Sequence, residues 1–285
     1  MSIIGEKGVR RILLVTAFSA LSALLLIALF IINEGVPFIF RYGLRDFLFS
    51  SEWKPAEGRF GIFPMLAASV WVTLGAMAVG APLGIAGAVF LSEFAPKSVM
   101  RIIKPAIELL AAIPSVVYGF IGVMVLAPLI RSSLGGPGLS ILAGSIILGI
   151  MILPTIMSIS IDSLLAVPQS FREGSLALGA TTWQGVYLVI VRAAKSGIIA
   201  GVILGMGRAI GETMAVIMVA GNAVKIPDSA LDSARTLTAN IALEMSYATG
   251  MHRQALFATG VVLFVVIIIL NSLATVVIKG KVARR

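Results

Sequence analysis

The stretch from Ile12 to Ile32 reads ILLVTAFSALSALLLIALFII and holds no charged residue. Because a helix rises about 1.5 Å per residue and the hydrocarbon core of a bilayer is about 30 Å thick, a run of about 20 apolar residues can cross a membrane. Lys7, Arg10 and Arg11 precede the run, as basic residues precede the apolar core of a signal peptide. The run is longer than a signal-peptide core and further apolar runs follow, so we predict a retained transmembrane helix.

Working outward from this run, the chain of 285 residues contains further apolar stretches of similar length. Together they predict an all-α integral membrane protein with about six transmembrane helices. We expect a single transmembrane domain over residues 1–285, with a first helix at about 12–32 and a core at about 63–278. The predicted spans are Ile12 to Ile32, Phe63 to Leu91, Ile107 to Ile130, Ser140 to Ile161, Gly197 to Asn222, and Ala255 to Ile278.

The composition agrees with a protein whose solvent is the lipid bilayer. Hydrophobic residues make up 59% of the chain and charged residues 12%, whereas a soluble domain carries about a quarter charged residues. A net charge of +9 would suggest nucleic acid as a partner of a soluble protein, but here the cations lie between apolar runs. The chain has no Cys and a single His, His252, so we expect neither a metal site nor a cofactor, and no nucleic-acid partner.

The distribution of basic residues predicts the topology. Most of the 22 Lys and Arg residues lie near the two ends of the chain, between the second and third spans, and between the fourth and fifth spans. The positive-inside rule then places both termini in the cytoplasm. The segments Glu34 to Ile62 and Ala223 to Gln254 are expected to face outward.

Sequence motifs for nucleotide hydrolysis and for common hydrolases are absent. No Gly-x-x-x-x-Gly-Lys-Ser/Thr sequence occurs, so the loop that cradles nucleotide phosphates is missing. The His-Glu-x-x-His zinc motif and the Gly-x-Ser-x-Gly nucleophile elbow are also missing. We therefore expect no enzymatic activity and no catalytic residue in this chain, and any ATP is hydrolysed elsewhere.

The fifth predicted span contains two charges, Arg208 and Glu212, in an otherwise apolar run. An arginine near the bilayer centre costs roughly 2.5 to 3.5 kcal/mol on insertion scales, so it should face protein or water and have a partner. A spacing of four residues places Glu212 on the same helix face as Arg208, so we expect the two to neutralise each other. One interpretation is an ion pair that only fixes helix packing. The other is a cation that meets an anionic substrate, because arginine donates two hydrogen bonds at once to an oxyanion.

The segment from Val167 to Trp183 predicts a bend between two short helices. Ser170 or a neighbour is expected to cap the first helix, with Glu173 in its first turn, and Gly179 is expected to end it. Such a pair projects from the membrane as a knob that fits a groove on another protein. An amphipathic helix lying in the membrane interface fits the pattern equally well.

The third predicted span combines Glu108 with the sequence Ile113-Pro-Ser-Val-Val-Tyr118-Gly. Backbone carbonyls freed beside Pro114 can be satisfied by Ser115 or can line a pathway. Taken singly, Ser115 and Tyr118 fit helix packing as well. We expect Glu108 to be a buried charge that pairs with a lysine or arginine near the inside surface.

The segment Glu173 to Gly179 resembles the cytoplasmic coupling loop of ABC-importer permeases, in which Glu-Ala-Ala is followed after three residues by Gly. Gly174 and Ser175 stand where that pattern has two alanines, and Arg192 stands where it has a final proline. Further segments, in the same order, resemble the permease subunits of phosphate importers. They are Trp53-Lys-Pro55 with Phe60-Gly-Ile62, Ile113 to Gly119, Arg208 to Thr213, and Thr236 to Ala239 with Glu244.

The resemblance implies an ABC importer type I permease fold in the cell inner membrane. It implies a second permease subunit, two ATP-binding subunits docked on the coupling loops, and an external phosphate-binding protein that delivers inorganic phosphate. Carried over by position, the ATPase coupling loop holds Glu173, Gly179 and Ala180, and the substrate pathway holds Arg208, Glu212, Thr213, Ser115 and Tyr118. The residues alone also allow sulfate, molybdate or phosphonate as substrate, or a self-contained channel or ion-coupled transporter.

Overall fold

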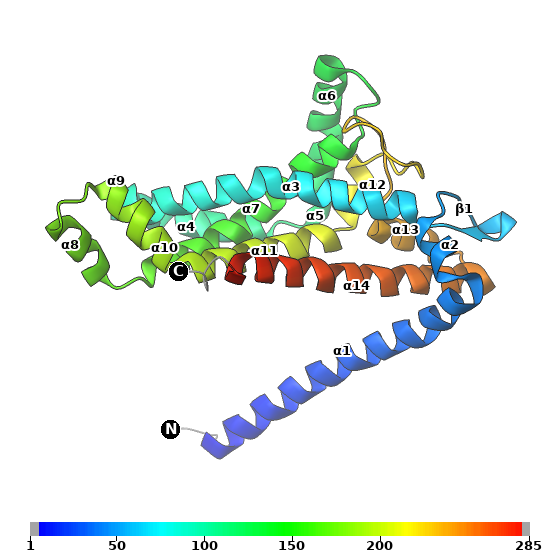
Figure 1. Cartoon of the computed structure of the whole chain (residues 1–285), viewed down its shortest axis with the longest axis horizontal. Helices are drawn as coiled ribbons and strands as arrows, with labels where there is room; N and C mark the ends of the chain where they lie inside the picture. The colour runs from blue at the N-terminus through cyan, green and yellow to red at the C-terminus, as the bar shows by residue number, and fades with distance from the viewer. Residues whose placement is uncertain (1–5, 281–285) are drawn as a thin grey trace.

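The structure is a computed structural model that describes residues 6–280. It is a long helical bundle with one small hairpin (Figure 1). The α-helices are α1 (Glu6–Tyr42), α2 (Leu44–Phe49), α3 (Phe63–Val89), α4 (Lys97–Ala112), α5 (Ser115–Ile121), α6 (Ala127–Leu134), α7 (Ile141–Leu165), α8 (Gln169–Ala177), α9 (Thr182–Gly185), α10 (Val191–Ala193), α11 (Lys195–Gly211), α12 (Met214–Val219), α13 (Leu237–Glu244) and α14 (Gly250–Gly280). The strands are β1 (Trp53–Lys54) and β2 (Arg59–Phe60), joined by a 3₁₀ turn at Pro55–Glu57; π-helical turns occupy Phe90–Phe94, Gly122–Leu126 and Val186–Ile190.

Within the described residues, five helical segments are long and apolar enough to cross a membrane. They are Gly8–Tyr42, Phe63–Phe94, Ser115–Leu134, Ile141–Leu165 and Gly250–Ser272. A sixth arises if Thr182–Ala193 and Lys195–Gly211, which are bent by 68° relative to each other, count as one span. The prediction of an all-α membrane protein with about six spans is confirmed.

Two predicted spans, Ile107 to Ile130 and Gly197 to Asn222, are each interrupted; the break beside Pro114 was predicted, and the break after Gly211 was not. The first is interrupted after α4, where Ile113 adopts extended backbone angles of φ −62° and ψ 130°. The residue before a proline is disfavoured in the helical region, so Pro114 explains this break. The second is interrupted after Gly211, where Glu212 is likewise extended with φ −68° and ψ 132°. Both breaks lie inside apolar sequence.

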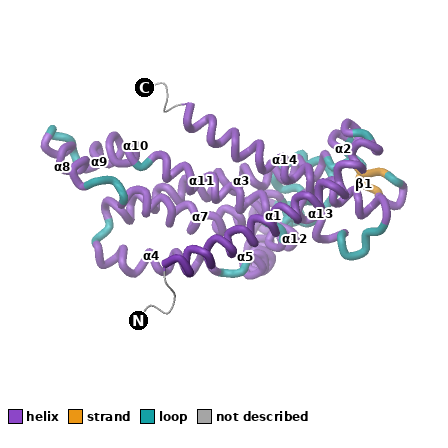
Figure 2. Tube along the Cα trace, turned by 90° about the horizontal axis from the view of Figure 1, so that it is seen from below, coloured by secondary structure: helices purple, strands orange, loops and turns teal. Residues whose placement is uncertain are grey.

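The bundle has two distinct ends. In both Figure 1 and Figure 2, α8 and α9 lie at one end, and the β1–β2 hairpin with α2 lies at the other. We call these the α8 end and the hairpin end. The first residues of α1 and the last residues of α14 lie towards the α8 end (Figure 1). The distance between α1 and α14 increases away from the hairpin end. Lys281, Arg284 and Arg285, which contribute to the predicted topology, lie outside the described residues.

Buried apolar residues form three clusters along the bundle. The central cluster joins α3, α5, α7, α11 and α12 around residues such as Met151 and Ile152. A second lies at the hairpin end around Phe38, Phe47 and Phe60, and a third lies at the α8 end around Leu91 and Leu164. The candidate site lies beside the central cluster, between the two end clusters.

Helices α3 and α7 pack closely against each other at glycines. A Cβ atom added to Gly80 would lie 2.7 Å from the carbonyl oxygen of Gly149 and from Ile152 Cγ1. A Cβ added to Gly149 would lie 2.9 Å from Val79 Cβ. Small residues let helix backbones approach each other in membranes, where packing replaces the hydrophobic effect as the main attraction between helices.

We predict that Gly80→Ala destabilises the protein by about 1 to 3 kcal/mol, because the new methyl group forces α3 away from α7. Gly207→Ala is the matched control, since a Cβ there meets no atom within 4 Å. It should be neutral or stabilising by up to about 1 kcal/mol, as expected for Gly to Ala in a helix. Thermal unfolding in mild detergent measures both. Equal effects of the two substitutions would contradict close α3–α7 packing at Gly80.

Candidate functional site

Arg208 lies in the last turn of α11 and connects three helices. Its Nη1 donates to Thr155 Oγ1 of α7 at 3.1 Å, and its Nη2 donates to the carbonyl oxygen of Ala111 in α4 at 3.4 Å. Ala111 is in the last turn of α4, whose carbonyls have no partners within their own helix. The negative end of the helix dipole adds attraction for the guanidinium. Arg208 is thus held at the break between α4 and α5.

The predicted Arg208–Glu212 ion pair was wrong: in the described part of the chain no ion pair joins these residues. The helical spacing argument fails because α11 ends at Gly211, so Glu212 leaves the helix face that carries Arg208. The Glu212 carboxylate instead accepts the backbone N–H of Ala215 at 3.1 Å, in the first turn of α12. The backbone carbonyl of Glu212 accepts the Thr238 hydroxyl at 2.9 Å.

The other predicted pathway residues lie at the same two breaks. Tyr118 is buried in α5, and its hydroxyl donates to the carbonyl oxygen of Leu110 at 2.8 Å. Ser115 is the half-buried first residue of α5. Thr213 follows Glu212, and its hydroxyl donates to the carbonyl oxygen of Gly211 at 3.2 Å. The breaks are neighbours, because α5 packs directly against α12.

A groove of about 600 Å³ adjoins Arg208 between α7, α11 and α14. Its apolar lining comes from Ala200, Ile203, Leu204 and Gly207, and its polar lining is Thr155, Arg208 and Asn271. Sequence reasoning missed Thr155 and Asn271. Each is an uncharged polar residue in a mainly apolar run that also contains serines, so its type does not single it out.

The prediction that Glu108 is a buried charge paired with a cation was wrong. Glu108 is exposed, because it belongs to the amphipathic helix α4 and not to a buried span. The nearby Lys104 instead donates to Asp162 at 2.6 Å. That hydrogen bond raises the pKa of Lys104 above its ordinary value. This ion pair attaches α4 to α7 near the α8 end.

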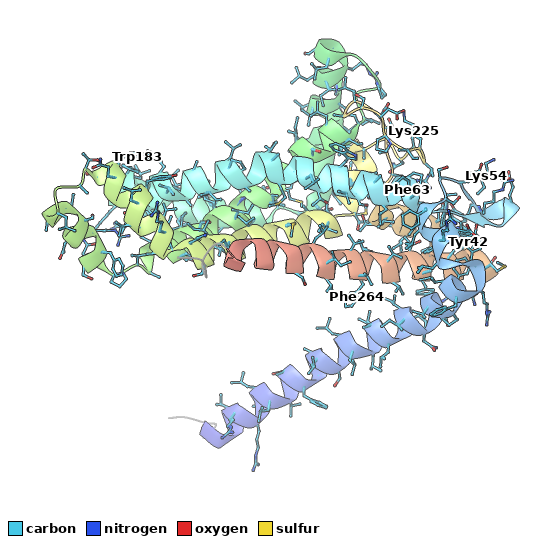
Figure 3. All side chains as sticks on the ribbon, in the orientation of Figure 1. Tyr42, Lys54, Phe63, Trp183, Lys225 and Phe264 are labelled. Carbon is cyan, nitrogen blue, oxygen red and sulfur yellow. The ribbon has the colours of Figure 1, made fainter. Side chains whose placement is uncertain are left out.

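The segment predicted to form a knob does consist of two short helices, α8 and α9, at one tip of the bundle, where Trp183 is labelled in Figure 3. Gly179 ends the first helix with φ +81°, and the N–H groups of Gly179 and Ala180 donate to the carbonyls of Leu176 and Ser175 at 2.9 and 3.1 Å. This is the glycine-terminated Schellman arrangement. The expected cap at Ser170 was wrong, because α8 starts after Pro168 without a side-chain cap. Glu173 and Gly179 are exposed.

An ion pair that sequence reasoning missed lies beneath α8. Arg172 donates from Nη2 and Nε to the two carboxylate oxygens of Glu93 at 2.6 and 3.0 Å. These hydrogen bonds raise the pKa of Arg172 above its ordinary value. The same guanidinium donates to the carbonyls of Val167 at 2.8 Å and Leu164 at 3.0 Å. The separation of 79 residues between Glu93 and Arg172 explains why no local pattern revealed the pair.

A second polar cluster lies at the hairpin end, around the buried Glu244. Its carboxylate accepts Trp53 Nε1 at 2.9 Å and Arg235 Nη1 at 2.7 Å, and it contacts His252 Nε2 at 2.8 Å. Arg235 also donates to Asn240 Oδ1 at 3.1 Å. The cluster joins β1, α13 and α14, so it fixes the segment whose Thr238 hydroxyl reaches the break at Glu212.

Comparison with known proteins relates the chain to transport permeases. Residues 80–282 match the family of binding-protein-dependent transport system inner membrane components. The chain is 43% identical over 263 residues to the probable ABC transporter permease protein YqgH of Bacillus subtilis, covering 90% of this chain and 85% of that protein. It is 37% identical over 250 residues to the phosphate transport system permease protein PstC of Mesorhizobium japonicum, covering 80% and 76%. For PstC of Haemophilus influenzae the identity is 34% over 275 residues, covering 88% and 87%.

Solved structures support the fold. An inward-facing structure of the MetNI methionine ABC transporter matches with a TM-score of 0.58 at 18% identity, covering 80% of this chain and 99% of that one. An amino acid ABC transporter solved with histidines matches with a TM-score of 0.54 at 16% identity, covering 75% and 91%. The predicted type I ABC importer permease fold is confirmed.

We predict that Glu244→Ala destabilises the protein by about 3 kcal/mol, because removal of one partner leaves Arg235 unpaired in a largely buried position. Glu57→Ala is the matched control, since its ion pairs with Lys54 and Arg59 are exposed and contribute less than about 1 kcal/mol. Thermal unfolding in detergent should separate the two variants by several degrees. A shift no larger for Glu244→Ala than for Glu57→Ala would contradict the cluster's role.

Proposed function

The chain belongs to the family of binding-protein-dependent transport system inner membrane components, and from this premise we propose that it is the permease subunit of an ATP-driven phosphate importer, a PstC. The relatives named PstC support phosphate as the substrate, at identities from 31% to 37% over most of the chain. The subunit forms half of the translocation pathway. ATP hydrolysis takes place in partner subunits, as the absence of a phosphate-cradling loop in the sequence suggests.

The observation that carries the proposal is the position of Arg208. Its guanidinium lies at a helix break beside a groove of about 600 Å³, and its hydrogen-bond partners are a hydroxyl and a backbone carbonyl, which are both uncharged. The positive charge therefore remains available to attract an anion. Neutral partners are also weaker competitors than a carboxylate for the donors that an oxyanion takes up. Glu212, Thr213, Ser115 and Tyr118 complete the proposed pathway at the two breaks.

The partners proposed for the chain follow from its family. They are a second permease subunit of the PstA type, two ATP-binding subunits of the PstB type, and an external phosphate-binding protein of the PstS type. The exposed tip formed by α8 and α9, with Glu173, Gly179 and Ala180, is the proposed contact with an ATP-binding subunit. The exposed apolar side chains of Leu176 and Leu178 favour contact of this tip with a protein groove.

We propose that the whole chain forms one permease domain in the cell inner membrane, with the α8 end and both termini in the cytoplasm. The cation distribution supports this orientation, since Lys97, Arg101 and Arg172 belong to the segments of the α8 end. Delivery of phosphate then takes place at the hairpin end.

We predict that Arg208→Gln reduces phosphate uptake by the assembled importer at least about tenfold, because a hydrogen bond to a charged group contributes about 1.5 to 3 kcal/mol. Thr155→Val is the matched control: it removes the hydroxyl that holds Arg208 but leaves the charge. Its loss of uptake should be smaller. Uptake of labelled phosphate, with membrane abundance measured alongside, tests both.

Normal uptake by Arg208→Gln would contradict the proposed site, and a loss equal to that of Thr155→Val would assign Arg208 to packing. Uptake of sulfate, molybdate or phosphonate in place of phosphate by the native assembly would change the substrate assignment. Phosphate flux through this chain alone in liposomes would favour a self-contained channel or secondary transporter.

The orientation predicts the labelling of single cysteines by an impermeant thiol reagent, against a native background without Cys. Ala230→Cys, exposed in the loop before α13, should react in intact cells. Ser98→Cys, exposed at the start of α4, should react only after the membrane is permeabilised. The reverse pattern would overturn the orientation and leave the fold unaffected.

A further inference from the structure

Arg172 joins three elements at the α8 end through one guanidinium. Arg172 belongs to α8 and forms a bidentate ion pair with Glu93, in the π-helical turn that continues α3. It also donates to the carbonyls of Leu164 and Val167 at the end of α7. Four hydrogen bonds thereby occupy the guanidinium, which offers five N–H donors. The Glu93 side chain is 5% exposed, so water competes little for the pair.

The Arg172 side chain is 21% exposed, because its guanidinium is bonded to Glu93 and to the end of α7. Ser175, one turn further along α8, is also buried, and its hydroxyl donates to the carbonyl oxygen of Arg172 at 2.8 Å. Glu173, Leu176 and Leu178 are exposed. A partner that binds the exposed residues of α8 therefore acts on a helix that Arg172 anchors to α7 and to the turn after α3.

The helix to which Arg172 is anchored also holds Arg208. Thr155 precedes Leu164 by nine residues of α7, which corresponds to about 13.5 Å along the helix axis. Thr155 Oγ1 accepts the hydrogen bond from Arg208 Nη1 at 3.1 Å. The contacts therefore run from α8 through Arg172 to the end of α7, and from the middle of α7 through Thr155 to Arg208.

We propose that Arg172 is a positioning residue that fastens α8 to α3 and α7, so that a displacement of α8 by an ATP-binding subunit moves the helix that holds Arg208. This inference rests on the proposed function and adds a residue to it. A guanidinium is required because its planar fork engages the carboxylate and the two carbonyls together. A lysine ammonium supplies the charge but not that geometry.

The test uses the complete importer reconstituted in liposomes and measures phosphate imported per ATP hydrolysed. Arg172→Gln should retain the ATP-binding subunits and their hydrolysis, because the exposed face of α8 is unchanged, while phosphate imported per ATP falls about tenfold. Such a change lies within the range observed when residues between coupled sites are altered. Arg172→Lys should lower the ratio by a smaller factor. Arg101→Gln, which removes an exposed cation from α4, is the matched control and should leave the ratio unchanged.

An exchange of charges separates coupling from simple ion pairing. Glu93→Arg with Arg172→Glu restores opposite charges, but a glutamate at position 172 donates no hydrogen bond to the carbonyls of Leu164 and Val167. Membrane abundance should recover in the exchanged protein, and phosphate imported per ATP should stay low. Full recovery of the ratio would overturn the proposal, as would an unchanged ratio in Arg172→Gln. Depletion of both Arg172→Gln and Arg172→Lys from the membrane would also overturn it, because Arg172 would then serve folding only.

The native complex distinguishes this inference from the proposed function. Failure of the native complex to import phosphate in the same assay would refute the substrate assignment. A native complex that imports phosphate, together with an unchanged ratio in the Arg172 variants, would refute the coupling role alone.

Discussion

The hydrogen bond from Arg208 to the Ala111 carbonyl satisfies a backbone group at the end of α4. A membrane protein must satisfy such groups internally. The last carbonyls of a helix have no partners within the helix and need other donors, most of all where water is scarce. α4 stops at Ala112, and the carbonyls of Leu110 and Ala111 accept from Tyr118 and Arg208. The break after α11 is satisfied in the same way, since the Glu212 carbonyl accepts from Thr238. Side chains thus supply hydrogen-bond donors to the carbonyls at both breaks.

This arrangement connects the site to both ends of the bundle. Towards the hairpin end, the connection runs through Thr238 on α13, which is fixed by the buried cluster around Glu244. Towards the α8 end it runs through Thr155 on α7, whose last turn is held by Arg172. Polar contacts of a few side chains thus join the site to both ends of the described bundle.

The sequence predicted the elements that depend on composition and local chemistry. Apolar runs of about 20 residues located most spans, and Gly179 was identified as the end of α8 because a left-handed residue there favours glycine. The predictions failed where long-range packing decides. The spacing of Arg208 and Glu212 implied one helix face, but the helix ends between them. Glu108 lay next to an apolar run, yet α4 is amphipathic and leaves it exposed. Thr155 and Glu93 lie 53 and 79 residues from Arg208 and Arg172, the residues they bind, so periodicity carries no information about these pairs.

The π-helical turn at Phe90–Phe94 has a consequence for how such chains diverge over evolution. A π turn holds one residue more than an α-helical turn, so loss of one residue would restore a regular helix with little damage to the backbone. Each residue of an α-helix is rotated by about 100° from the one before it. A deletion within the turn would therefore swing Glu93 away from Arg172 while the span itself survived. The number of residues before Glu93 therefore sets the direction in which its carboxylate points, and hence whether it reaches Arg172.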